Sequence, residues 1–153
     1  MSLKNLKIGG WSFYVDTERK NELDTDKSGK WMYFFDSTEE GIAFAKRVCL
    51  EIVNSGVAIE AKHTDEDIVR ISGSGVCCFY CDGANIEAHK KIIDFMIKNE
   101  MIRKTKTGKL FNISFKYDTQ TRENQYGSEF ESQIKLKNFV DLETGEWLPN
   151  IHI

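Results

Sequence analysis

Polar side chains that could hold a phosphate group lie in or beside two stretches that are predicted to be strands. Lysine supplies a point positive charge and hydroxyl groups donate hydrogen bonds, and together these suit a phosphate. The residues that meet this description are Lys62, Thr64, Ser114, Lys116 and Thr121. The competing interpretation is that lysines on a polar sheet face are simply solvated, as most surface lysines are.

His63, next to Lys62, would allow a second chemistry. A β-elimination of phosphate needs a base to remove the α proton and an acid to protonate the leaving oxygen, and a desolvated lysine and a histidine could divide these roles. Neighbouring residues of a regular strand point to opposite faces. Both side chains can therefore reach one substrate only if the strand ends or bulges at Lys62.

The two stretches that carry these residues are the apolar run 57–61 and the alternating run 110–118. A period of two places Lys62 and Lys116 on the side opposite the apolar residues in each run. The residues expected to face the core are Val57, Ile59, Ala61, Phe111, Ile113, Phe115 and Tyr117. Lys62 and Lys116 are therefore predicted to share one exposed face of a sheet.

The remaining pattern predicts further strands and two helices. Ser37 and Glu40 form a capping-box signature before helical spacing over 38–54, and Asn85 can cap a second helix that ends near Asn99. Further strands are predicted over 11–15, 29–35, 75–81 and 130–137. The chain is thus expected to form a single α+β domain over 1–153, with a curved, mostly antiparallel sheet and helices on one face.

Several short segments, in this order, carry a resemblance to known proteins. They are Trp11–Tyr14, Ser28–Trp31, Ala61–Lys62, Val76–Asp82 and Phe115–Asp118, followed by Thr121 and Tyr126. In the order of its elements the chain resembles the cap-binding translation initiation factors. It is more similar to a little-characterised family with that kind of fold, some members of which are labelled phosphothreonine lyase-like.

The resemblance implies that fold and a phosphate-bearing ligand, and it adds Tyr126 to the candidate ligand contacts. Cap-binding factors hold a methylated guanine between two tryptophans. Segment 17–30, which precedes Trp31, contains no tryptophan, so this pair has no match in the chain.

Composition excludes several classes of function. A net charge of -3 and a pI of about 5.7 disfavour general nucleic-acid binding and binding to anionic membranes. No apolar run reaches the roughly 20 residues that span a bilayer, and the start of the chain lacks a signal-peptide apolar region, so a cytoplasmic location is expected. The spacing of Cys77, Cys78 and Cys81 matches no zinc motif, so neither a metal nor a cofactor is expected.

Three functions remain after these exclusions. The first is a non-catalytic binding module for a nucleotide or a phosphorylated peptide, and the second is a lyase with Lys62 as base and His63 as acid. The third is a protein-interaction module that uses an exposed strand edge. The basic cluster of Arg103, Lys104, Lys106 and Lys109 could contact phosphates or could only make a soluble turn.

Overall fold

The computed structural model describes residues 2–24, 26–118 and 134–153. The described residues form a six-stranded antiparallel sheet and three α-helices, which confirms the predicted α+β class. The strands are β1 (Leu3–Ile8), β2 (Trp11–Asp16), β3 (Ser28–Asp36), β4 (Glu60–Thr64), β5 (Ser74–Asp82) and β6 (Lys116–Tyr117). The helices are α1 (Glu39–Asn54), α2 (Glu66–Ser72) and α3 (Ile86–Lys98), with 3-10 turns η1 (Lys20–Glu22) and η2 (Leu136–Asn138).

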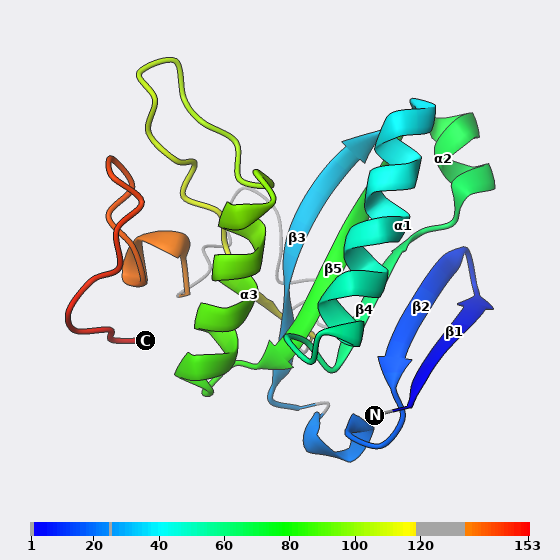
Figure 1. Cartoon of the computed structure of the whole chain (residues 1–153), viewed down its shortest axis with the longest axis horizontal. Helices are drawn as coiled ribbons and strands as arrows, with labels where there is room; N and C mark the ends of the chain where they lie inside the picture. Colours follow the sequence, from blue (N-terminus) through cyan, green and yellow to red (C-terminus); the bar gives the residue numbers. More distant parts are fainter. Residues whose placement is uncertain (1, 25, 119–133) are drawn as a thin grey trace.

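The sheet has the order β1-β2-β4-β5-β3-β6, and α1 and α3 cover one of its faces (Figure 1). We call this face the helix face. Strand register aligns Tyr14, Ala61, Phe79 and Trp31 across four strands of the helix face, and all four are buried. The opposite face carries Lys30, Lys62 and Lys116, and we call it the lysine face.

The elements with the strongest sequence signals form close to their predicted bounds. These are β2, β3, β5, α1 and α3. Asn85 caps α3 as predicted, because its side-chain oxygen accepts a hydrogen bond from the backbone N–H of Ala88 at 3.0 Å. The cap of α1 is Thr38 rather than Ser37, since the Thr38 hydroxyl accepts from the N–H of Gly41 at 3.0 Å.

Two elements were missed by the sequence interpretation. Strand β1 forms a hairpin with β2 through Gly9 and Gly10, whose φ angles of 58° and 83° suit a tight two-residue turn. Helix α2 begins after Asp65, whose carboxylate accepts from the N–H of Asp67 at 3.3 Å, and ends at Gly73 with a φ of 92°. The acidic residues there stabilise the start of a short helix.

The predicted strand 57–61 is displaced toward higher residue numbers. The N–H of Ala58 donates to the carbonyl of Ile52 at 3.0 Å, which ties this residue to the end of α1 instead of to a neighbouring strand. Pairing begins at Glu60 and continues to Thr64. Strand β4 therefore includes Lys62 and His63, whereas the predicted strand stops at residue 61.

The predicted strand 110–118 is mostly irregular, and only Lys116 and Tyr117 pair with β3. The N–H of Ile113 donates to the carbonyl of Phe111 at 2.9 Å, and this tight local bond interrupts the extended backbone. Phe115 is buried as expected, but Phe111 is 45% exposed. Most of the predicted strand 130–137 lies outside the described residues, and residues 136–138 form η2.

A hydrogen-bonded pair of aromatic residues lies at the centre of the core. The indole N–H of Trp31 donates to Nδ1 of His89 at 3.0 Å, and Nε2 of His89 donates to the carbonyl of Gly83 at 2.8 Å. His89 is thus the neutral tautomer with its proton on Nε2. The rings of Phe115 and Phe139 pack on it, with centroid distances of 4.6 and 5.3 Å.

We expect Trp31→Phe to lower the free energy of unfolding by about 2–4 kcal/mol, because it leaves Nδ1 of His89 with only the weak thiol donor of Cys81 at 3.7 Å and opens space in the core. Urea unfolding followed by circular dichroism measures the change. Trp147→Phe is the matched control, since Trp147 is 36% exposed and should cost less than about 1 kcal/mol. Equal losses in the two variants would contradict the importance of the Trp31–His89 pair.

Candidate functional site

Lys62 lies on the lysine face, where its ammonium group sits among aromatic rings. Its Nζ atom is 3.9 Å from the ring centroid of Trp11, 5.5 Å from that of Phe13 and 5.9 Å from that of Tyr80. Burial lowers the pKa of Lys62, while the faces of the rings favour the charged amine. The closest ring belongs to β2, so Lys62 leans toward that strand.

His63 lies on the helix face and is buried. Its Nδ1 donates to the carbonyl of Thr64 at 2.8 Å, and its Nε2 accepts from the hydroxyl of Tyr14 at 3.3 Å. Because β4 is regular through Thr64, Lys62 and His63 point to opposite faces of the sheet. The predicted division of acid and base roles between them is therefore not available to a single substrate.

Lys62 and Lys116 share the lysine face as predicted, but they are far apart. Strands β5 and β3 separate β4 from β6, which places the two backbones about 14 Å apart at the usual strand spacing. The hydroxyl of Thr64 accepts from the N–H of Val76 at 3.0 Å. Two further predicted contacts, Thr121 and Tyr126, lie outside the described residues.

Lys30 lies between the two predicted lysines, directly opposite Lys116, and the sequence interpretation missed it. Its Nζ is 3.2 Å from a carboxylate oxygen of Asp118 and 6.0 Å from the ring centroid of Tyr80. Side chains alternate along β3, so Lys30 lies on the face opposite Trp31. This alternation could have identified Lys30 from the sequence. Asp118 offsets its charge, so Lys30 is a poor phosphate contact.

A pocket of about 380 Å³ beside β3 collects two of the predicted site residues, Ser114 and Lys116. We call it the edge pocket. Its lining is Met32, Tyr33, Phe34, Met101, Arg103, Phe111, Ile113, Ser114 and Lys116. Within the described ranges, neither Arg103 nor Lys116 forms a salt bridge. The edge pocket thus offers two cations and a hydroxyl beside an apolar wall.

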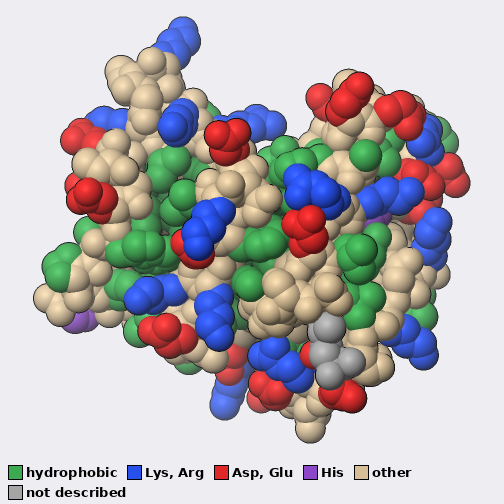
Figure 2. Space-filling model, in the orientation of Figure 1, with side chains coloured by type: hydrophobic (Ala, Val, Ile, Leu, Met, Phe, Trp, Pro, Cys, Tyr) green, Lys and Arg blue, Asp and Glu red, His purple; other side chains and the backbone are tan. Residues whose placement is uncertain are grey.

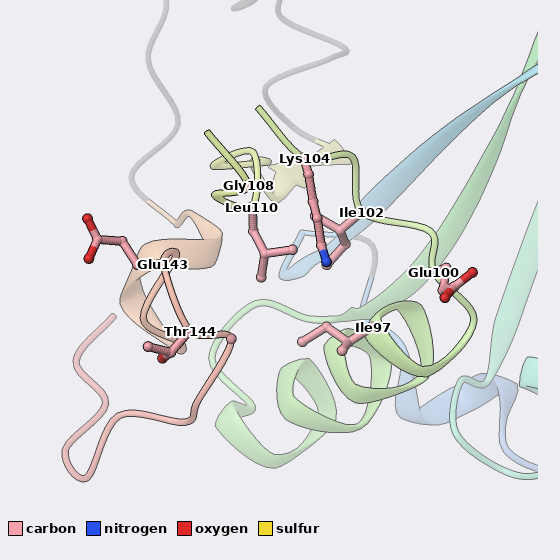
Figure 3. A pocket seen from close by; sticks show the side chains of 9 residues that line it. Ile97, Glu100, Ile102, Lys104, Gly108, Leu110, Glu143 and Thr144 are labelled. Atoms are coloured by element: carbon pink, nitrogen blue, oxygen red, sulfur yellow. The ribbon is translucent and has the colours of Figure 1, made fainter. Parts of the chain in front are cut away.

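A second pocket, of about 450 Å³, lies between the end of α3 and the turns near residues 108 and 144 (Figure 3). We call it the turn pocket. Figure 3 shows the amine of Lys104 extending toward Ile97, while the carboxylates of Glu100 and Glu143 point away. Glu143 instead pairs with Lys109 at 3.1 Å. The basic cluster predicted from sequence is therefore divided, with Arg103 in one pocket and Lys104 in the other.

Charges elsewhere on the surface are mixed. On the side that carries α1 and α3, basic and acidic side chains are interspersed, with hydrophobic side chains between them (Figure 2). Arg70, for example, lies 3.3 Å from Glu39 and 3.6 Å from Glu66. Among the described residues on this side, basic side chains do not gather into an extended surface of the kind that neutralises the backbone of a nucleic acid.

The cysteines are buried free thiols. Burial raises the pKa of Cys78 to about 12, which keeps its sulfur protonated and unreactive. Among the residues that the structure describes, no three His, Cys, Asp or Glu side chains lie together as metal ligands. In the same part of the chain, no helix has both the length and the apolar character to cross a membrane.

Comparison with known proteins assigns no family: no protein-family model matches the chain, and no curated protein matches it significantly. The resemblance to the cap-binding factor fold therefore stays a prediction. What the chain can bind has to be inferred from its own side chains.

Stability should depend on pH through His63 and His89, because burial lowers the pKa of both. The unfolded chain takes up protons near the ordinary value of 6.5, whereas the folded chain does so only at lower pH. The stabilisation that comes from keeping both histidines neutral should therefore be fully present above pH 6.5. The free energy of unfolding should decrease as the pH falls below this value. Urea unfolding at pH 7.5, 6.5 and 5.5 measures this slope.

His89→Gln should reduce the slope, since glutamine can keep a donor toward Gly83 and an acceptor toward Trp31 without titrating. His152→Gln, at an exposed position in the C-terminal tail, should keep the wild-type slope. The same slope in wild type and in His89→Gln would contradict a neutral His89 in the native state.

Proposed function

We propose that this chain is a binding module for a phosphate-bearing ligand, and that Arg103, Ser114 and Lys116 hold the phosphate in the edge pocket. The supporting observation is that Ser114 and Lys116, which are both predicted phosphate contacts, line the same pocket as Arg103. Among the described residues, the guanidinium of Arg103 has no carboxylate partner. Arginine can bind a phosphate through two parallel hydrogen bonds, and lysine and serine add a charge and a donor.

The apolar wall of the edge pocket suits the rest of such a ligand. Phe34 is 57% exposed and Phe111 is 45% exposed, and both line the pocket. Exposed aromatic rings next to cations can stack on a nucleotide base or pack against an apolar side chain of a peptide. A nucleotide or a phosphorylated peptide therefore fits the pocket better than inorganic phosphate alone.

The lyase alternative has less support from this geometry. A β-elimination needs a base and an acid within reach of one substrate. Of the described residues that line the edge pocket, none is a histidine, an aspartate or a glutamate, and Lys116 supplies the amine. Lys62 and His63, the predicted pair, lie on opposite faces of the sheet and outside this lining.

Isothermal titration calorimetry at low ionic strength tests the proposal by measuring the affinity for phosphate, for mononucleotides and for peptides that contain phosphothreonine. We expect Arg103→Ala and Lys116→Ala each to weaken binding by about tenfold or more, which corresponds to the loss of one charge-assisted hydrogen bond. Lys104→Ala is the matched control, because Lys104 is a neighbouring lysine that lines the turn pocket instead. Lys62→Ala should leave the affinity unchanged.

Three outcomes would contradict the proposal. The first is that no phosphorylated compound binds. The second is that Lys104→Ala weakens binding while Lys116→Ala does not, which would move the site to the turn pocket. The third is that Lys62→Ala abolishes binding, which would place the phosphate beside Lys62, near Trp11 on the lysine face.

A further inference from the structure

One long edge of β3 is only partly paired. Strand β6 pairs with Gly29 and Lys30, and in the described parts of the chain residues 31–36 have no strand beside them on that side (Figure 1). Just before β6, the N–H of Ile113 donates to the carbonyl of Phe111 and the N–H of Phe115 donates to the carbonyl of Ile134, so these two donors are not directed at β3. An unpaired strand edge offers a row of backbone donors and acceptors to an added strand.

The edge pocket lies along this unpaired stretch. Met32, Tyr33 and Phe34 belong both to the unpaired edge and to the pocket lining. Met32 and Phe34 lie on the lysine face and Tyr33 on the helix face, so the pocket has walls on both sides of the edge. An extended chain laid there would have alternate side chains against each wall.

The cations of the pocket are also placed for an added strand. Lys116 pairs with Lys30, and Met32 follows Lys30 by two residues. A residue of an added strand that pairs with Met32 would therefore lie about 7 Å from Lys116 along the direction of β6. Its side chain would lie on the lysine face, as the side chain of Lys116 does. Arg103 lines the same pocket as Lys116 and is close enough to Tyr33 for its charge to favour the phenolate, although burial raises the pKa of Tyr33 overall.

We propose that the phosphate-bearing ligand is a phosphorylated peptide that pairs with β3 as an added strand, with its phosphate held by Lys116 and Arg103. This inference rests on the proposed function and names the class of ligand. Backbone pairing would supply affinity, the two cations would select the phosphorylated residue, and Phe34 and Phe111 would receive an apolar neighbour. A mononucleotide would leave the edge of β3 unpaired.

The test begins with an oriented library of seven-residue peptides that carry a central phosphothreonine, from which the tightest binder is taken. Two versions of that peptide are then made, with backbone N-methyl groups on the odd or on the even residues. Because alternate N–H groups of a strand face its partner, we expect one version to lose at least tenfold in affinity and the other to bind like the parent. The unphosphorylated peptide should also lose at least tenfold.

A variant of the protein supplies the second measurement. Phe34→Ala removes a ring beside the edge and should lower the affinity for the parent peptide by about fivefold or more. Ile71→Ala is its matched control, since Ile71 is 88% exposed on α2, outside the edge pocket, and should bind the peptide like wild type.

The outcomes separate this inference from the proposed function. Equal binding of both N-methylated versions would overturn strand addition, and so would binding of mononucleotides with no binding of any phosphopeptide. In both cases, phosphate binding that depends on Lys116 would still stand. If no phosphorylated compound binds at all, the proposed function fails and this inference fails with it.

Discussion

The hydrogen bonds that join Trp31, His89 and Gly83 position much of the structure. They connect β3 to α3 and to the turn between β5 and α3 in the centre of the core. Phe115 packs on the same pair, so the segment that leads into β6 is held against β3. Gly29 permits that approach, because a Cβ atom there would meet the carbonyl of Lys116 and the ring of Phe115. The edge pocket therefore depends on a core contact that does not line it.

The regular geometry of β4 separates groups that are adjacent in sequence. On the helix face His63 is buried and accepts a hydrogen bond from Tyr14, whereas on the lysine face Lys62 lies over Trp11. Each group is stabilised by its own face, the histidine as a neutral ring and the lysine against aromatic surface. The cations of the proposed site, Arg103 and Lys116, instead line the pocket beside β3.

Much of the fold could be predicted because its signals are local. Helical spacing and a cap define α1 and α3, and continuous or alternating apolar residues define β2, β3 and β5. The true length of β6 could not be predicted. Apolar and polar residues alternate over 110–118 whether or not the backbone pairs with a neighbouring strand. The backbone of Phe111 and Ile113 bonds locally and to Arg103, which leaves two residues to pair.

The sequence by itself determined the α+β class and the sharing of one face by Lys62 and Lys116, because a period of two assigns faces without knowledge of strand order. It also predicts Ser114 and Lys116 as phosphate contacts. Only the tertiary structure decided that β5 and β3 separate the two lysines and that Arg103 lies in one pocket with Lys116. The physical reason is that strand order and the path of residues 101–116 depend on long-range packing around Trp31, which no local pattern encodes.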